Sequence, residues 1–176
     1  RKKMTDMERL AICPGSFDPI TKGHEDIIRR AGTLFDRVIV VVSSNPDKRP
    51  IFSLDERVGL IRDVCGDMPN MEVDKFSGLL IDYVRAHKAV AIVKGLRAVS
   101  DFDYEFQMAL TNKKLYPYAE TVFLTPNSDN MYLSSSMVRQ IARFGGDVGS
   151  FVPAAILDTV TERLRAQYAA VGTTSE

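Results

Sequence analysis

Short apolar runs alternate along the chain with segments whose apolar residues recur at helical spacing. The runs predict strands at residues 10–13, 37–42, 71–74, 90–93 and 121–124. The segments between and after them predict helices at 25–35, 53–64, 79–87, from 101 onward, at 137–144, and from 152 onward. Strands that alternate with helices of this length predict an α/β fold, a doubly wound five-stranded parallel sheet with right-handed crossovers.

Two local signals fix helix ends. Ser53 followed by Glu56 is a capping box that starts the second predicted helix. Gly145 and Gly146 end the helix at 137–144. In a parallel sheet all carboxyl strand ends lie on one rim, so the loops that follow the strands are expected to meet there.

Composition limits the classes of protein to consider. The chain has 176 residues, 45% of them apolar, and a formal net charge of zero, which favours neither nucleic acid nor an anionic membrane as a partner. No apolar run is long enough for a bilayer span, and a cytoplasmic location is expected. We expect one domain at 9–171, a disordered or cloning-derived tail at 1–8 and a polar tail at 172–176. Cys13 and Cys65 lack metal-ligand spacing, so we expect reduced structural thiols and no protein metal site.

The stretch 13–24 contains most of the candidate chemistry. It leaves the first strand, turns through two prolines and two glycines, and enters a helix beside His24. Helix N-termini at strand ends direct unpaired N–H groups at anions, so phosphate is the expected ligand. Neither of the common glycine-rich phosphate motifs occurs in the chain. The Ser16 hydroxyl and the His24 imidazole would supplement the backbone there, although Ser16 alone fits an ordinary turn equally well.

Three later loops add polar groups to the same rim. Each has a plain alternative: surface charge for Lys48, Lys94 and Arg97, and helix capping for the serines at 134–136. Lys94 directly follows four apolar residues, which places it at the end of the sheet. Glu105 has two open interpretations, pairing with a cation or contact with a ribose. The shared rim favours a functional role for the set.

With these motifs identified, the chain resembles the bacterial phosphopantetheine adenylyltransferases, nucleotidyltransferases with a Thr/His-x-Gly-His motif and a Rossmann-like fold. The resemblance rests on PGSFDPITKGH at 14–24, KGLRAVSDFDYE at 94–105 and LSSSMVR at 133–139, and covers nearly the whole chain. It implies adenylyl transfer from ATP to 4′-phosphopantetheine in coenzyme A biosynthesis. It also implies Mg²⁺ held mainly by ATP phosphates and water, a homohexamer, and coenzyme A as a feedback ligand.

The resemblance also assigns site residues. Catalytic roles fall on His24, Lys48, Lys94 and Ser16. Phosphopantetheine would contact Ser16, Lys48, Leu80 and Lys94. ATP would contact Ser16, Phe17, His24, Gly95, Leu96, Arg97, Glu105, Asn130, Met131, Tyr132, Leu133, Ser134, Ser135 and Ser136. Many family members have threonine in place of Ser16 and arginine in place of Lys94, substitutions that would alter affinity for substrate rather than the type of reaction.

The predicted reaction needs no general base. The attacking phosphate oxygen is already an anion at neutral pH, so the site need only position two substrates and neutralise charge. Two other functions stay open. One is a sister nucleotidyltransferase acting on nicotinamide mononucleotide or transferring a cytidylyl group, and the other is a non-catalytic adenine-nucleotide sensor.

Overall fold

A computed structural model of the chain describes residues 8–44, 49–97, 99–130 and 132–169. It contains a five-stranded parallel sheet of order β3-β2-β1-β4-β5. The strands are β1 (Leu10–Gly15), β2 (Arg37–Ser43), β3 (Met71–Phe76), β4 (Ala91–Gly95) and β5 (Glu120–Leu124). The α-helices are α1 (Lys22–Leu34), α2 (Leu54–Cys65), α3 (Leu80–Ala86), α4 (Val99–Leu115), α5 (Ser135–Arg143) and α6 (Leu157–Ala169). The predicted doubly wound α/β fold is confirmed.

Alternating side chains of the strands form two apolar layers, one on each face of the sheet. One layer joins Ala11, Cys13, Val38 and Val40 to helices α1, α2, α5 and α6, and the other joins Ile12 and its neighbours to α3. The interior strands are apolar on both faces because helices cover both. None of the described helices has the length and apolar character needed to cross a bilayer.

The sheet reverses its direction of growth between β1 and β4. Strands β2 and β3 extend it on one side of β1, and β4 and β5 extend it on the other. The register pairs Ile12 with Ile92, so the ends of β1 and β4 leave the sheet side by side. In open α/β sheets a ligand crevice forms at this switch point.

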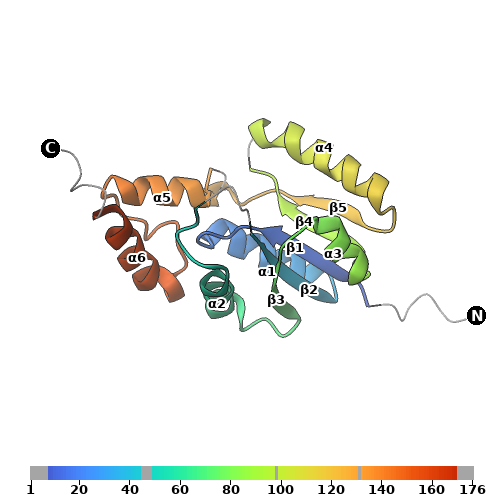
Figure 1. Ribbon diagram of the computed structural model, residues 1–176, viewed down its shortest axis with the longest axis horizontal. Helices are drawn as coiled ribbons and strands as arrows, with labels where there is room; N and C mark the ends of the chain where they lie inside the picture. Colours follow the sequence, from blue (N-terminus) through green and yellow to red (C-terminus); the bar gives the residue numbers. More distant parts are fainter. Residues whose placement is uncertain (1–7, 45–48, 98, 131, 170–176) are drawn as a thin grey trace, which may run out of the picture.

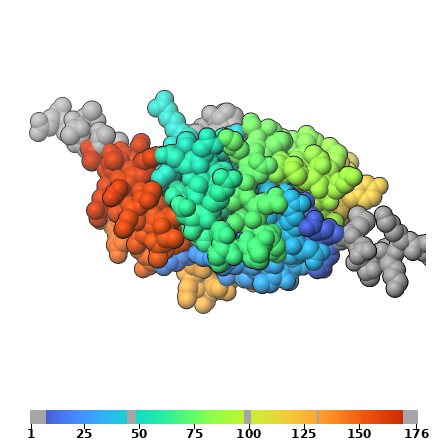
Figure 2. Space-filling model, turned by 90° about the horizontal axis from the view of Figure 1, so that it is seen from below, coloured from blue at the N-terminus to red at the C-terminus, as the bar shows by residue number. Residues whose placement is uncertain are grey.

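Helices α5 and α6 pack together at the carboxyl end of the sheet, as Figure 1 shows. Helix α6 also lies against α2 in Figure 2. The Arg163 guanidinium of α6 stands over the Phe52 ring at 5.0 Å and pairs with Glu56 of α2. A 3₁₀ turn (Ala154–Ile156) leads into α6, and a second one (Ser128–Asn130) precedes α5. The segments after β5 therefore pack beside the carboxyl end of the sheet.

Several predicted boundaries shift. Lys94 and Gly95 belong to β4, where they pair with Phe123 and Leu124, and not to the loop in which they were expected. Helix α4 begins at Val99 instead of 101, and α5 at Ser135 instead of 137. A Cβ at Gly95 would come within 3.1 Å of Ile27, so glycine lets α1 approach the sheet closely. Hydrogen bonds to neighbouring elements decide such ends, and a single sequence does not contain that information.

The capping box predicted for α2 is present. The Ser53 hydroxyl accepts from Glu56 N, and the Glu56 carboxylate accepts from Ser53 N. Cys13 and Cys65 are free and buried, and burial raises the pKa of their thiols to about 12 and about 11. Residues 1–7 and 172–176 of the predicted tails lie outside the described residues, and the assignment of 9–171 to one domain stays a prediction.

Candidate active site

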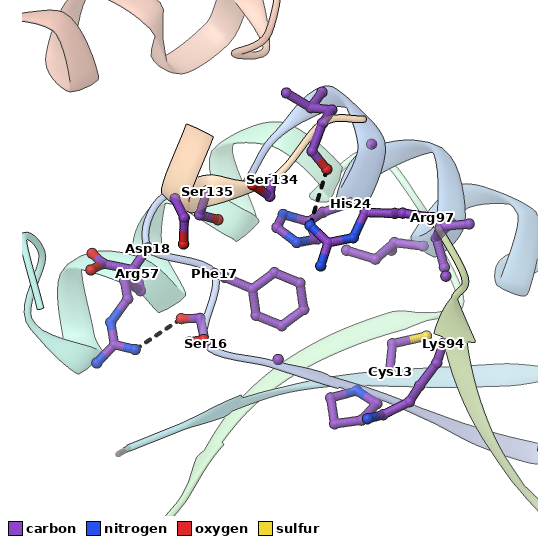
Figure 3. Close-up of a pocket in the computed structure, with 18 of the residues that line it drawn as sticks. Cys13, Ser16, Phe17, Asp18, His24, Arg57, Lys94, Arg97, Ser134 and Ser135 are labelled. Atoms are coloured by element: carbon purple, nitrogen blue, oxygen red, sulfur yellow. Dashed lines mark hydrogen bonds between the residues drawn. The ribbon is translucent and has the colours of Figure 1, made fainter. Parts of the chain in front are cut away.

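A cavity of about 590 Å³ opens at the carboxyl ends of β1 and β4. It brings together twelve of the predicted site residues: Ser16, Phe17, His24, Lys94, Gly95, Arg97, Glu105, Asn130, Leu133, Ser134, Ser135 and Ser136. Figure 3 shows Phe17 and His24 between the sheet end, with Cys13 and Lys94, and the loop with Ser134 and Ser135. Segments more than one hundred residues apart in sequence thus line one cavity.

The remaining predicted residues are placed differently. Leu96 and Tyr132 do not line the cavity, and the Tyr132 side chain is exposed. Leu80, the first residue of α3, packs against the apolar layer on that face of the sheet and is not among the residues that line the cavity. Lys48 and Met131 lie outside the described residues. Their predicted contacts with substrate stay predictions.

His24 is the third residue of α1 and completes a capping box with Thr21. The Thr21 hydroxyl accepts from His24 N at 3.3 Å, and Thr21 N donates to His24 Nδ1 at 3.1 Å. In most capping boxes a Glu or Gln side chain takes this second place. Because Nδ1 accepts a hydrogen bond from the backbone, the neutral ring carries its proton on Nε2.

The surroundings keep His24 neutral. Burial, with a smaller effect from the charge of Arg97, lowers the pKa of the imidazole to about 4. The Phe17 ring meets the imidazole edge-on, with 5.0 Å between ring centroids. A neutral His24 has one free donor, Nε2–H, and no free ring nitrogen that could accept a proton.

Lys94 and Arg97, the two cationic side chains near the end of β4, both have partners within the protein. Lys94 Nζ lies 2.7 Å from Glu105 Oε2, and both side chains are about three-quarters buried. This contact confirms the interpretation of Glu105 as the partner of a cation. Arg97 donates to the Leu133 carbonyl at 3.2 Å and lies 3.3 Å from Asp101. Arg97 therefore ties the loop after β4 to the serine loop.

Each of the three serines has a separate internal partner. The Ser134 hydroxyl caps α5 by accepting from Met137 N, and the Ser135 hydroxyl donates to the Pro19 carbonyl at 2.7 Å. Ser136 accepts from Arg139 Nη2 at 3.2 Å. Capping accounts for one hydroxyl, as the helix alone requires. The Ser135 hydroxyl connects α5 with the turn after β1, and the Ser136 hydroxyl bonds within α5.

Sequence reasoning missed three charged residues of the cavity wall: Asp18, Arg57 and Arg139. The Asp18 carboxylate accepts from the backbone N–H groups of Ile51 and Phe52, at 2.9 Å each. An Asp before proline is typical of a turn, and arginines on amphipathic helices are usually solvated. No local signal distinguishes these three, because their partners are backbone groups of distant segments.

The pocket at the switch point of a doubly wound sheet, with a neutral histidine at a helix N-terminus among cations and hydroxyls, is typical of a nucleotide-handling transferase. The cytidylyltransferase-like family matches residues 12–141. A bifunctional NMN adenylyltransferase/ADP ribose pyrophosphatase from Francisella tularensis shares the fold, with a TM-score of 0.70 at 15% identity, over 94% of this chain and 54% of that one.

Closer relatives define the particular family. A phosphopantetheine adenylyltransferase from Caldanaerobacter subterraneus subsp. tengcongensis is 56% identical over 160 residues, 91% of this chain and 98% of that protein. Another from Alkaliphilus metalliredigens is 57% identical over 155 residues, 88% of this chain and 99% of that protein. The chain belongs to the phosphopantetheine adenylyltransferases, within the cytidylyltransferase-like family. The predicted enzyme class, a nucleotidyltransferase of coenzyme A biosynthesis, is confirmed.

Proposed function

We propose that this enzyme transfers the adenylyl group of ATP to 4′-phosphopantetheine and releases 3′-dephospho-coenzyme A and pyrophosphate. A phosphate oxygen of the acceptor attacks the α-phosphorus of ATP in line. The new P–O bond forms as the bond to the bridging oxygen of pyrophosphate breaks. The observation that carries the proposal is the neutral His24, with one free donor, Nε2–H, in a cavity that Lys94, Arg97 and three serines also line.

Direct attack, without a covalent enzyme intermediate, fits the chemistry of the pocket. The Cys13 thiol stays protonated because burial raises its pKa to about 12. Ser16 has no activating base in His24, since Nδ1 accepts from Thr21 N and Nε2 carries the proton. The attacking phosphate oxygen needs no activation, so positioning and charge neutralisation account for catalysis.

The proposal assigns a role to each polar group. His24 Nε2–H donates to the α-phosphate as its charge grows in the transition state. Lys94 and Lys48 hold the acceptor phosphate, with Ser16 between the two substrates. Arg97 and the serine loop hold the β- and γ-phosphates. For Lys94 this requires exchange of its contact with Glu105 for one with the phosphate.

Magnesium fits this pocket only as an ion carried by the nucleotide. Among the described residues no group of three or more His, Cys, Asp and Glu side chains is arranged to hold a metal. The two carboxylates of the wall are already engaged, Asp18 with backbone N–H groups and Glu105 with Lys94. Bound to phosphate oxygens and water, Mg²⁺ would neutralise the charge of the triphosphate.

The proposal includes a homohexamer and coenzyme A as a feedback ligand in the same pocket. Support for the oligomer comes from α4, which carries exposed apolar side chains at Phe102, Phe106 and Leu110. The Phe102 and Phe106 rings stack with 5.6 Å between centroids. An apolar helix face of this kind favours burial against another subunit. A cytoplasmic location stays a prediction.

Calorimetry and a pyrophosphate-release assay test the proposal. We expect calorimetry to show that ATP binds. We expect pyrophosphate to form only when phosphopantetheine is present together with ATP and Mg²⁺. Nicotinamide mononucleotide as acceptor and CTP as donor serve as matched controls. Release with either control but not with ATP and phosphopantetheine would indicate a sister transferase, and ATP binding without release under any condition would indicate a sensor.

A further inference from the structure

Side chains from other elements hold the turn between β1 and α1 by donating hydrogen bonds to its carbonyl oxygens. Side chains from two later helices donate to three of them: Arg57 Nη1 to Ser16 O at 2.8 Å, Arg139 Nη1 to Asp18 O at 2.6 Å, and Ser135 Oγ to Pro19 O at 2.7 Å. Arg57 comes from α2, and the other two come from α5. Figure 3 shows the hydrogen bond from Arg57 to Ser16 at the edge of the pocket.

Arg57 is a charged side chain in an unusual place. It is 4% exposed, and it also donates to the carbonyls of Ser43 and Ser53, at 3.3 Å each. All its hydrogen-bond acceptors among the described residues are neutral carbonyls, although the Asp18 carboxylate lies close enough to interact with its charge. Burial of a guanidinium is costly, so three well-placed acceptors indicate a role that an apolar side chain could not fill.

The residue inside this turn has a backbone conformation that needs support. Phe17 has φ of 49°, in the left-handed region that residues with a side chain rarely adopt. Such conformations persist where surrounding contacts hold them. The Ser16–Phe17 peptide is planar and trans, so fixing the Ser16 carbonyl also fixes the direction of the Phe17 N–H. The Asp18 carbonyl on the other side of Phe17 is fixed by Arg139.

The two guanidinium groups also leave an excess of positive charge behind the turn. Asp18 is the carboxylate nearest to both, with its Oδ2 at 3.9 Å from Arg139 Nη1. One carboxylate beside two guanidiniums leaves a surplus positive charge next to a pocket built for anions. Both guanidinium groups line the pocket, so this charge lies close enough to act on a bound phosphate.

We infer that Arg57 and Arg139 are positioning residues of the reaction. They clamp the carbonyls on either side of Phe17 and so hold the Ser16 hydroxyl and the Phe17 N–H in the orientation that the substrates require. The inference rests on the proposed function for its kinetic consequences. The clamp itself is a property of the turn and can be measured without substrate.

Kinetics of Arg57→Ala and Arg139→Ala, with Arg29→Ala as the matched control, test this inference. Arg29 also donates to a carbonyl, that of Val64, and to carboxylates, but it contacts neither the turn nor the pocket. Misplaced reacting groups cost about 100-fold in rate. We therefore expect kcat to fall about 10- to 100-fold in each clamp variant, with a smaller change in KM for ATP, and to stay within about twofold in the control.

Rescue separates positioning from general stability. Millimolar guanidinium chloride should restore part of the kcat of Arg57→Ala, because the ion can enter the space that the side chain leaves, and should not change the control. Arg57→Lys, which keeps the charge without the planar fork, should be intermediate and serves if the alanine variant does not fold. Wild-type kcat in folded Arg57 and Arg139 variants would overturn the inference.

Hydrogen exchange distinguishes failure of the clamp from failure of the proposed function. Amide exchange in residues 14–24 of the protein without substrate should become faster in both clamp variants and stay unchanged in Arg29→Ala. Unchanged exchange in the clamp variants would overturn the clamp whatever the reaction is. An inactive wild-type enzyme would overturn the proposed function. The hydrogen-exchange result would then still test the clamp by itself.

Discussion

His24 combines a structural task with a chemical one. As the third residue of α1 it closes the capping box with Thr21, and the same hydrogen bond to Nδ1 places the proton on Nε2. A Glu at this position could cap the helix equally well, but it would bring a negative charge to a phosphate site. The helix N-terminus therefore prepares the donor before any substrate arrives.

Replacement of His24 by Ala should lower kcat by roughly 10²- to 10⁴-fold, the range typical of a lost side chain that acts in the transition state. The Kd for ATP should change little, because the donor acts mainly as charge grows. His87→Ala is the matched control, since His87, the C-cap of α3, stacks on Tyr83 and is not among the residues that line the pocket. Pyrophosphate release and calorimetry measure both quantities. A His24→Ala enzyme with near-normal turnover would exclude the assigned role.

The pH dependence of stability should also report His24. Its pKa is about 4 in the folded protein and about 6.5 in the unfolded chain, so the unfolded chain binds more protons between these values. The contribution of neutral His24 to stability is therefore fully present above about pH 6.5 and is lost as the pH falls toward 4. A shift of this size corresponds to at most about 3 kcal/mol at about 1.4 kcal/mol per pKa unit, less for a partly exposed ring.

Chemical unfolding of wild type and His24→Gln from pH 4 to pH 8 measures this effect. The difference in free energy of unfolding isolates His24 from carboxylates such as Glu56, whose pKa is lowered to about 2 by Arg163 and the Ser53 N–H. We expect the variant to gain stability relative to wild type as the pH falls below 6.5. A difference that does not vary with pH would contradict the low pKa.

At the scale of elements, the start of α2 determines where Arg57 lies. The Ser53 capping box begins the helix, and Arg57, four residues after the cap, reaches back to the Ser53 carbonyl and across to the turn. The same cap includes Glu56, which pairs with Arg163 of α6. The helix cap can be predicted from the sequence. It places Arg57 and Glu56 for contacts that the sequence does not predict.

Ser53→Ala should destabilise the enzyme by about 1 kcal/mol, the usual effect of losing an N-cap. For a chain of this length that corresponds to a decrease in Tm of about 2 to 4 °C. Thr33→Ala, which removes an exposed hydroxyl bonded only within α1, is the control and should change Tm by less. Thermal unfolding followed by circular dichroism measures both. Equal Tm values for the two variants would argue against a capping contribution from Ser53.

At the scale of the whole molecule, strand order assembles the site. Neighbouring strands β1 and β4 are about eighty residues apart in sequence, and the switch of direction between them opens the pocket. The long helix α4 beyond β4 carries exposed apolar side chains at Phe102, Phe106 and Leu110. The pocket is thus formed within one chain, while the exposed apolar side chains of α4 are expected to be covered by a second copy of the chain.

Phe106→Glu should disrupt the proposed homohexamer, because it places a charge in the centre of the apolar face of α4. Light scattering coupled to size-exclusion chromatography should then give a mass closer to that of the 19.6 kDa chain. Leu34→Glu, an exposed apolar residue at the end of α1, is the control and should retain the wild-type mass. A wild-type mass for Phe106→Glu would contradict the assignment of α4 to the interface.

Most of the architecture was predictable because it depends on local periodicity. The β-branched run at 37–42 and the alternation of five such runs with helical segments predicted the parallel sheet, and Ser53 with Glu56 predicted a helix start. The candidate site was predictable where a polar residue comes at the carboxyl end of a buried strand, as Lys94 does. Leu80 is not among the residues that line the cavity, and its contact with phosphopantetheine, which came from resemblance, stays a prediction.

The sequence by itself determined the sheet, the turn at 13–24 between β1 and α1, and the family, because each is encoded in residues close together in the chain. Only the tertiary structure decided the tautomer of His24, the pairing of Lys94 with Glu105 and the clamp of Arg57 and Arg139. Those features depend on which backbone carbonyl or side chain a polar group meets after folding. In a buried site every polar group must find such a partner, and packing of distant segments selects it.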